Sequence, residues 1–181
     1  MHSQWAARTA NLVGAWSLVV ADAVTRSTQR ETGLGGAVPA ALVTIRAYRD
    51  QSIEELRGAL GLSQPGTVRL VDRLVAEGWV ERRPGRRPRT VALALTPAGR
   101  RMTRRVIAAR ERAIRELIAP LAADEAEVLE RALERLLHAR GRRGRDPERV
   151  CRLCERAVCD RCPVAEGSDE AGEPPAAPRG E

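Results

Sequence analysis

The sequence predicts a mainly α-helical fold with one small β-hairpin, and three observations support this. Hydrophobic residues make up 43% of the 181 residues but aromatic residues only 2%, so the core must consist of Ala, Val, Leu and Ile, which suits packed helices. Apolar residues recur at helical spacing over most of the chain. The pattern changes to that of strands only within residues 79–95, around a loop rich in Pro, Gly and Arg.

The charge composition indicates a polyanionic partner. The 31 basic residues outnumber the 24 acidic ones, which gives a formal net charge of +7. All 31 are arginines, because the sequence contains no lysine. Guanidinium groups bind phosphate through paired hydrogen bonds and read guanine edges, but a GC-rich genome would also replace Lys codons with Arg codons. Only the placement of the arginines can decide between these two explanations.

The chain is long enough for one domain with a small appendage that folds without disulfides. Its most apolar stretch, residues 11–24, has the spacing of an amphipathic helix, which we favour over a signal peptide cleaved near residues 21–23. No run reaches the roughly 18 apolar residues of a membrane span. We therefore expect a cytoplasmic protein with reduced thiols and no membrane partner.

Residues 1–36 predict one long helix over about 5–30, which glycines at 33, 35 and 36 bring to an end. This helix is longer than the core of one small domain requires. A long end helix with one apolar face often packs on a partner chain. We therefore expect it to be a dimerisation helix.

Residues 37–100 predict three helices, over about 39–48, 52–60 and 63–77, and then a hairpin. The second helix begins with a capping box in the sequence SIEE and ends at Gly61, since glycine adopts the left-handed conformation at little cost. The third begins with a capping Ser in the sequence SQPG, where Pro is tolerated in the first turn. The last two helices thus flank a tight turn.

A helix-turn-helix of this kind braces its second helix so that the solvent face of that helix can enter the major groove of DNA. We expect Thr67, Arg69 and Arg73 to be well placed for base contacts. The buried side is expected to carry Val68, Val71, Leu74 and Val75.

The predicted hairpin consists of a strand over 79–83, a basic loop and a strand over 90–95. Residues 82–115 contain twelve arginines and a single acid, Glu111, a clustering that codon bias does not predict. A hairpin of this size can lie along the DNA backbone or reach a minor groove. The alternative is a solvated basic face with no partner, but beside a helix-turn-helix the nucleic-acid interface is favoured.

Residues 52–102, above all the stretches LSQPGTVRLVDRLVAEGWVERRP and VALALTPAGR, resemble the winged helix-turn-helix of the MarR-type transcriptional regulators. The flanking helices extend the resemblance over about residues 5–140. It implies a homodimer with a β-wing that binds a pseudo-palindromic operator, which we expect to act as a repressor released by a small ligand, an oxidant or a metal. By position, the resemblance implies DNA contacts from the recognition-helix residues Ser63, Gln64, Gly66, Thr67, Arg69 and Arg73, and from the wing residues Arg86, Arg87 and Arg89.

The wing departs from the family's pattern two residues before Arg89, where an acid is common but this chain has Arg87. The wing arginine therefore lacks its usual carboxylate partner. We expect stronger contact with the DNA backbone and a steeper salt dependence of binding, since each neutralised phosphate adds roughly 0.9 to the log-log slope.

Residues 101–140 predict two long amphipathic helices, separated by Pro120, that complete the dimerisation region. The second helix is expected to begin with a capping box at Asp124 and Glu127. A linker and a cysteine segment follow over residues 141–166. Residues 167–181 are rich in Pro, Ala, Gly and Glu, so we expect a disordered tail.

The cysteine segment contains two Cys-x-x-Cys pairs that can present four thiolates to one tetrahedral metal: Cys151, Cys154, Cys159 and Cys162. One zinc per chain is the favoured interpretation. An iron–sulfur cluster, redox-active thiols and thiols without a ligand remain open, because only four residues separate the pairs. The segment can be structural or sensory.

The sequence carries no signature of an enzyme, because it has no Ser/His/Asp constellation, no Gly-rich phosphate loop and no βαβ pattern to hold a thiol oxidoreductase site. We therefore expect a sequence-specific DNA-binding regulator. The alternative is a non-specific architectural nucleic-acid-binding protein, which would bind scrambled DNA as tightly as its own promoter.

Overall fold

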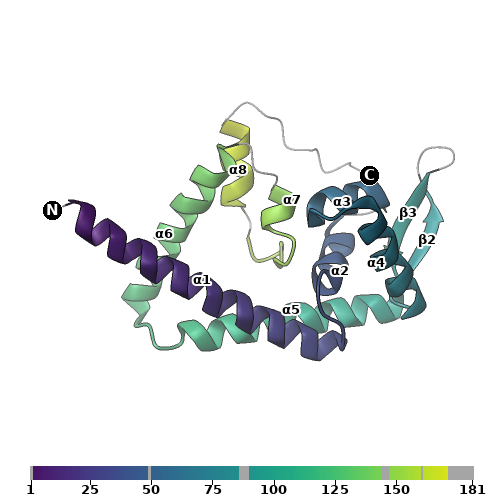
Figure 1. The fold of residues 1–181 in the computed structure, drawn as a ribbon, viewed down its shortest axis with the longest axis horizontal. Helices are drawn as coiled ribbons and strands as arrows, with labels where there is room; N and C mark the ends of the chain where they lie inside the picture. The colour runs from purple at the N-terminus through teal and green to yellow at the C-terminus, as the bar shows by residue number, and fades with distance from the viewer. Residues whose placement is uncertain (1, 49, 86–89, 144–146, 160, 171–181) are drawn as a thin grey trace.

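The computed structural model describes residues 2–48, 50–85, 90–143, 147–159 and 161–170, and it confirms the predicted mainly helical fold. Figure 1 shows α2–α4 and a small sheet at one end, the long helices α1 and α5 side by side, and α6 with α8 at the other end. The elements in chain order are α1 (His2–Thr32), α2 (Val38–Ala47), β1 (Gln51–Ser52), α3 (Ile53–Leu60), α4 (Gln64–Ala76), β2 (Val80–Pro84), β3 (Val91–Leu95), α5 (Pro97–Ile118), α6 (Ala123–Gly141), α7 (Pro147–Val150) and α8 (Pro163–Glu170).

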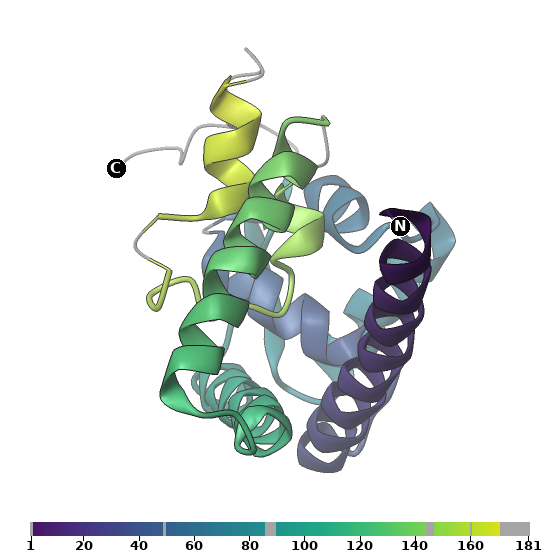
Figure 2. The same ribbon diagram turned by 90° about the vertical axis from the view of Figure 1, so that its left-hand side faces the viewer.

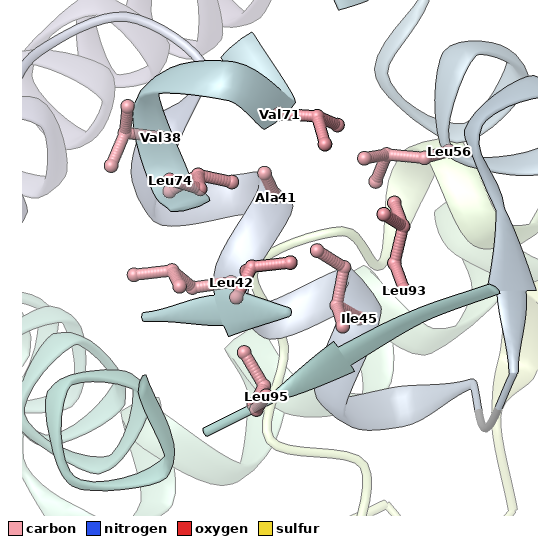
Figure 3. Close-up of a cluster of buried hydrophobic side chains, with 10 residues drawn as sticks. Val38, Ala41, Leu42, Ile45, Leu56, Val71, Leu74, Leu93 and Leu95 are labelled. Carbon is pink, nitrogen blue, oxygen red and sulfur yellow. The ribbon is translucent and has the colours of Figure 1, made fainter. Parts of the chain in front are cut away.

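One aliphatic core holds α2, α3, α4 and the sheet together, and we call residues 38–95 the winged unit. Figure 3 shows side chains from these elements pointing toward one another. Leu42, Leu56 and Leu74 are fully buried there, and burying a side chain of this size stabilises a fold by about 1.5–3 kcal/mol. The buried members of the cluster are Val38, Ala41, Leu42, Ile45, Leu56, Val71, Leu74, Val80, Leu93 and Leu95.

The start and end of α3 confirm the predicted local signals. The Ser52 backbone N–H donates to a Glu55 carboxylate oxygen at 2.8 Å, and the Glu55 N–H donates to the Ser52 hydroxyl at 3.2 Å, which completes the capping box. Gly61 ends the helix at φ 65°, in the left-handed region where a side chain would be strained.

The predicted hairpin is present as β2 and β3, paired antiparallel from Val80 opposite Leu95 to Pro84 opposite Val91. The sequence did not indicate β1, which pairs with the other edge of β3. This strand is only two residues long, so it has no alternation of its own to reveal it.

The base of the hairpin is fixed to the start of α5. The Thr96 N–H donates to the Trp79 carbonyl at 3.0 Å, and the Thr96 hydroxyl donates to the Gly78 carbonyl at 2.6 Å. A Cβ at position 99 would lie 1.9 Å from the Trp79 carbonyl oxygen, so only glycine allows this approach. The wing and the first turn of α5 are therefore one packed joint.

Helix α1 has two different halves. Its C-terminal half packs along α5, where Val24 and Thr28 are buried and Glu31 accepts from Arg105 at 2.9 Å. Residues 6–19 are exposed throughout, including Leu12 and Leu18, which expose 57% and 68% of their surface. The predicted long helix is confirmed, and half of it has no cover within the described chain.

The start of α6 corrects the predicted capping box. The helix begins at Ala123, so its N-cap is Ala122, and Asp124 lies inside the first turn. Glu125 accepts the Ala122 N–H at 2.9 Å, whereas alanine has no side-chain oxygen to return the bond. Only half of a capping box exists here, two residues before the predicted one.

The predicted disorder from residue 167 is wrong for residues 167–170, which continue α8. Gly167 is buried, and a Cβ there would lie 2.1 Å from the His138 carbonyl oxygen, so glycine lets α8 pack closely against α6. Figure 2 shows α8 alongside α6, on the other side of the molecule from α1. The rest of the predicted tail, residues 171–181, lies outside the described residues. No described helix combines the length and hydropathy of a membrane span.

Candidate nucleic-acid interface

The helix-turn-helix is formed by α3, the turn at Gly61 and α4. Ser63 is the N-cap of α4, and its hydroxyl accepts the Gly66 N–H at 3.3 Å. Pro65 lies in the first turn, where its missing N–H leaves no donor unsatisfied. These local signals fix the start of α4 at Gln64, as the sequence predicts.

The outer face of α4 carries most of the predicted contact residues. Ser63, Gln64, Arg69 and Arg73 are exposed, and Gly66 is partly exposed. Within the described residues, neither Arg69 nor Arg73 pairs with a carboxylate. Two guanidinium groups one helical turn apart can therefore reach phosphates or base edges.

Thr67 corrects the expected set, because it is fully buried instead of facing solvent. It precedes Val71 and Leu74 by four and seven residues, so all three lie on the core stripe of α4. Its hydroxyl donates to the Ser63 carbonyl at 3.0 Å. Conversely Val68, expected in the core, exposes 37% of its surface because it is rotated away from that stripe.

An ion pair that the sequence did not indicate links the recognition helix to the wing. Arg82 on β2 donates to Asp72 on α4 at 2.6 Å. Both side chains are more than a third exposed, so the pair adds little stability. It does neutralise the acid between Arg69 and Arg73, and it orients α4 against β2.

The described part of the wing ends at Gly85 and resumes at Thr90. The Gly85 N–H donates to the Thr90 carbonyl at 2.8 Å, which closes the hairpin just before the tip. The predicted contact residues Arg86, Arg87 and Arg89 lie outside the described residues.

The nine arginines of the cluster that the structure describes do not form one surface. Seven of them lie on α5, which leads away from the wing (Figure 1). Four of these already have partners: Arg100 donates to the Leu95 carbonyl, Arg105 pairs with Glu31, Arg115 pairs with Glu111, and Arg110 lies 4.0 Å from the Cys154 sulfur. The candidate interface is therefore confined to the outer face of α4 and the wing.

The cysteine segment brings two of its predicted ligands to contact distance. The Cys151 and Cys162 sulfurs are 3.7 Å apart, and none of the four cysteines forms a disulfide. Cys154 is partly buried, while Cys159 is exposed. Across the described ranges, no three His, Cys, Asp or Glu side chains form a group that could hold a metal ion. The zinc site thus stays a prediction.

The pKa values of the first cysteine pair move in opposite directions. The Cys151 thiol donates a hydrogen bond to the Cys154 sulfur, which lowers the pKa of Cys154 to about 6, and Arg110, Arg156 and Arg152 favour its thiolate further. The interaction with Cys154, together with burial, raises the pKa of Cys151, so this thiol keeps its proton. Cys154 is thus the thiolate of the pair at neutral pH.

Comparison with known proteins agrees with this geometry. The family model described as "MarR family" matches residues 32–89, which cover most of the winged unit. The "Transcriptional repressor MprA" of Escherichia coli K12 is 33% identical over 100 residues, which are 54% of this chain and 57% of that protein. The matched region thus spans little more than half the length of that relative.

Solved structures share the fold over a longer part of the chain. A MarR family protein from Bacillus stearothermophilus, 24% identical, superposes with a TM-score of 0.66 over 75% of this chain and 95% of its own. Apo MarR from E. coli, 28% identical, gives a TM-score of 0.58 over 68% of this chain and 96% of its own. Together with the capped helix α4 and the wing joined to α5, these matches show that the chain has the winged-helix fold of MarR-family proteins and that residues 32–89 match the family model.

Proposed function

We propose that the chain is a homodimeric, sequence-specific DNA-binding regulator that acts in the cytoplasm as a repressor and has no catalytic role. The observation that carries the proposal is the outer face of α4, where Arg69 and Arg73 are exposed on a helix braced by a complete core. This helix enters the major groove, and the wing lies along the neighbouring backbone. The similarity to a transcriptional repressor of E. coli supports the same reading.

A second copy of the chain is the proposed cover for the two end helices. Apolar side chains lie exposed on the N-terminal half of α1 and along α6, and a soluble monomer rarely exposes so many on neighbouring turns. A two-fold dimer would cover them and present two copies of α4 to a pseudo-palindromic site. These exposed residues are Leu12, Val13, Trp16, Leu18 and Val19 on α1, and Val128, Leu133, Leu136 and Leu137 on α6.

A small effector that releases the operator has a candidate site where α1 meets α2. A cavity of about 300 Å³ lies there, lined by residues that include Val24, Thr28, Gln29, Pro39 and Leu60. Its walls combine apolar side chains with a hydroxyl and an amide, as small-molecule sites do. A ligand wedged between α1 and the winged unit would change the spacing of the two recognition helices.

The test is the affinity of the full chain for the DNA upstream of its own gene, compared with a scrambled duplex of equal length and salt. A regulator prefers its operator by about 10³-fold or more. Arg69→Ala and Arg73→Ala should each weaken operator binding by about tenfold, as expected for the loss of one guanidinium contact of 1–3 kcal/mol. Arg112→Ala, an exposed arginine on α5, is the matched control.

Equal affinity for both duplexes would support the non-specific architectural alternative. Loss of binding in Arg112→Ala, with Arg69→Ala and Arg73→Ala unchanged, would move the interface to α5. Either result would overturn the proposed role of α4.

A further inference from the structure

The cysteine segment is not a loose appendage, because it packs on the winged unit and α5. Leu153 contacts a second buried cluster of Val43, Val106 and Ile107. Glu155 accepts from Arg46 on α2 at 2.9 Å. The segment therefore has a fixed place in the fold.

Two arginines of the segment add contacts to the same surface. The Arg156 guanidinium lies over the Tyr48 ring, 4.3 Å from its centre. Arg149 lies against the turn of the helix-turn-helix, so close that a Cβ at Gly61 would be 2.8 Å from its guanidinium carbon. The residues that hold the segment in place thus lie beside or between its cysteines.

The sulfur positions match a tetrahedral thiolate site in part. Four sulfurs bound at about 2.3 Å to one zinc ion lie about 3.8 Å apart, and the Cys151 and Cys162 sulfurs are 3.7 Å apart. These two come from different Cys-x-x-Cys pairs, so the fold brings one member of each pair into contact. Cys151, Cys154 and Cys162 are partly buried, whereas Cys159 is exposed, so a four-thiolate site would have to bury Cys159.

An open arrangement of thiols is expected when no metal is bound, since metal sites of this size close only as the metal binds. Four thiolates around Zn²⁺ carry a net charge of −2. Arg110 lies 4.0 Å from the Cys154 sulfur, and Arg152 and Arg156 also place positive charge near it. These groups would offset the charge of the closed site.

We propose that Cys151, Cys154, Cys159 and Cys162 close around one Zn²⁺ per chain, and that this closure locks the segment onto α2 and the helix-turn-helix turn. Four Zn–S bonds form, and one proton leaves for each thiol that is still protonated. No electrons are transferred, so no oxidant or reductant is required. The proposal is independent of operator binding, because free protein tests it.

The first experiment uses the full chain, stripped of metal and kept reduced, and titrates it with Co²⁺ and then Zn²⁺. We expect one Co²⁺ per chain, visible and charge-transfer bands of a tetrahedral thiolate complex, and bleaching when Zn²⁺ displaces Co²⁺. Cys159→Ser and Cys162→Ser should each weaken Co²⁺ binding by about 100-fold or abolish it. Val158→Ser is the matched control, since Val158 is the most exposed large apolar residue described and is no ligand.

The second experiment tests the lock by limited trypsin digestion, because Arg152 and Arg156 lie in the docked part of the segment. We expect Zn²⁺ to slow cleavage after both arginines at least tenfold in the native chain. In Glu155→Gln, which keeps all four sulfurs, Co²⁺ bands should persist while protection falls, because the contact with Arg46 is lost.

Several results would overturn the proposal. A reduced chain with four titratable thiols that binds no Co²⁺ excludes the site, and so does iron with acid-labile sulfide in protein purified without oxygen. Unchanged Co²⁺ bands in Cys159→Ser exclude the four-thiolate set. Equal cleavage with and without Zn²⁺ excludes the lock.

Discussion

The winged unit and the two end helices draw on the same aliphatic residues and use them in opposite ways. In the winged unit, Leu42 and Leu74 are fully buried by neighbours from the same chain. On the end helices, Leu18 and Leu136 expose 68% and 64% of their surface. An apolar helix face therefore indicates that a helix is covered, but it does not tell whether the cover comes from the same chain.

The largest effect should come from a cavity in the winged unit. Leu74→Ala removes a fully buried side chain from the core and should lower the free energy of unfolding by about 2–5 kcal/mol. Leu136→Ala on α6 removes the same atoms from an exposed site and is the matched control. Denaturant unfolding at low protein concentration measures both, and equal losses would break the contrast between the two regions.

A charge on the exposed face of α1 should weaken the proposed dimer, with little effect on the folding of the winged unit. Leu12→Glu should raise the dissociation constant of the dimer by about thirtyfold, near 2 kcal/mol, because a buried carboxylate would lack a partner. Leu12→Met, which keeps the apolar contact, is the control. Sedimentation velocity over a dilution series reads the result, and an unchanged constant would place the dimer contact elsewhere.

A smaller effect is expected at the start of the recognition helix. Ser63→Ala removes the hydroxyl that accepts the Gly66 N–H and should cost about 1 kcal/mol of stability. Ser17→Ala, in the exposed half of α1, removes a hydroxyl bonded only to the Gly14 carbonyl and should cost nearly nothing. Thermal unfolding distinguishes the two, and similar losses would mean that the cap does not set the start of α4.

The mildest perturbation concerns the cysteine segment, which belongs to neither region. In metal-free protein, alkylation of Cys154 should rise with pH through a midpoint near its pKa of about 6, because only the thiolate reacts. Arg110→Gln should raise that midpoint, since it removes a positive charge beside the sulfur. Mass spectrometry of the labelled peptide follows the rate, with Cys154→Ser as control. A midpoint near that of an ordinary thiol would show that neither Cys151 nor the neighbouring arginines lower the pKa of Cys154.

Local signals account for what the sequence predicted correctly. The capping serines at 52 and 63 and the left-handed glycine at 61 determine helix ends from a few adjacent residues, so the helix-turn-helix and the hairpin were predictable. The family resemblance then predicted DNA contacts on the outer face of α4, and this role stays a prediction. The burial of Thr67 was not predicted, because this residue was assigned to the side of the helix that faces DNA. Its helical spacing from Val71 and Leu74 places it on the buried side instead.

What the sequence could not predict depends on contacts between distant residues. Arg46 and Glu155, which dock the cysteine segment, are 109 positions apart. The close packing of α8 on α6 depends on a single glycine, Gly167, in a stretch whose composition indicates disorder. The arginines of residues 82–115 are likewise spread out, because α5 carries seven of them along its length, away from the wing.

The contacts between Trp79, Thr96 and Gly99 couple the orientation of α5 to that of the wing. Because the glycine permits a backbone contact that no other residue would, the wing and the first turn of the helix turn together as one piece. The 22 residues of α5 span about 33 Å, so a displacement of about 6 Å at its far end tilts the helix and the attached wing together by about ten degrees. A displacement of the end of α5 next to α6 would therefore rotate the wing by a small angle.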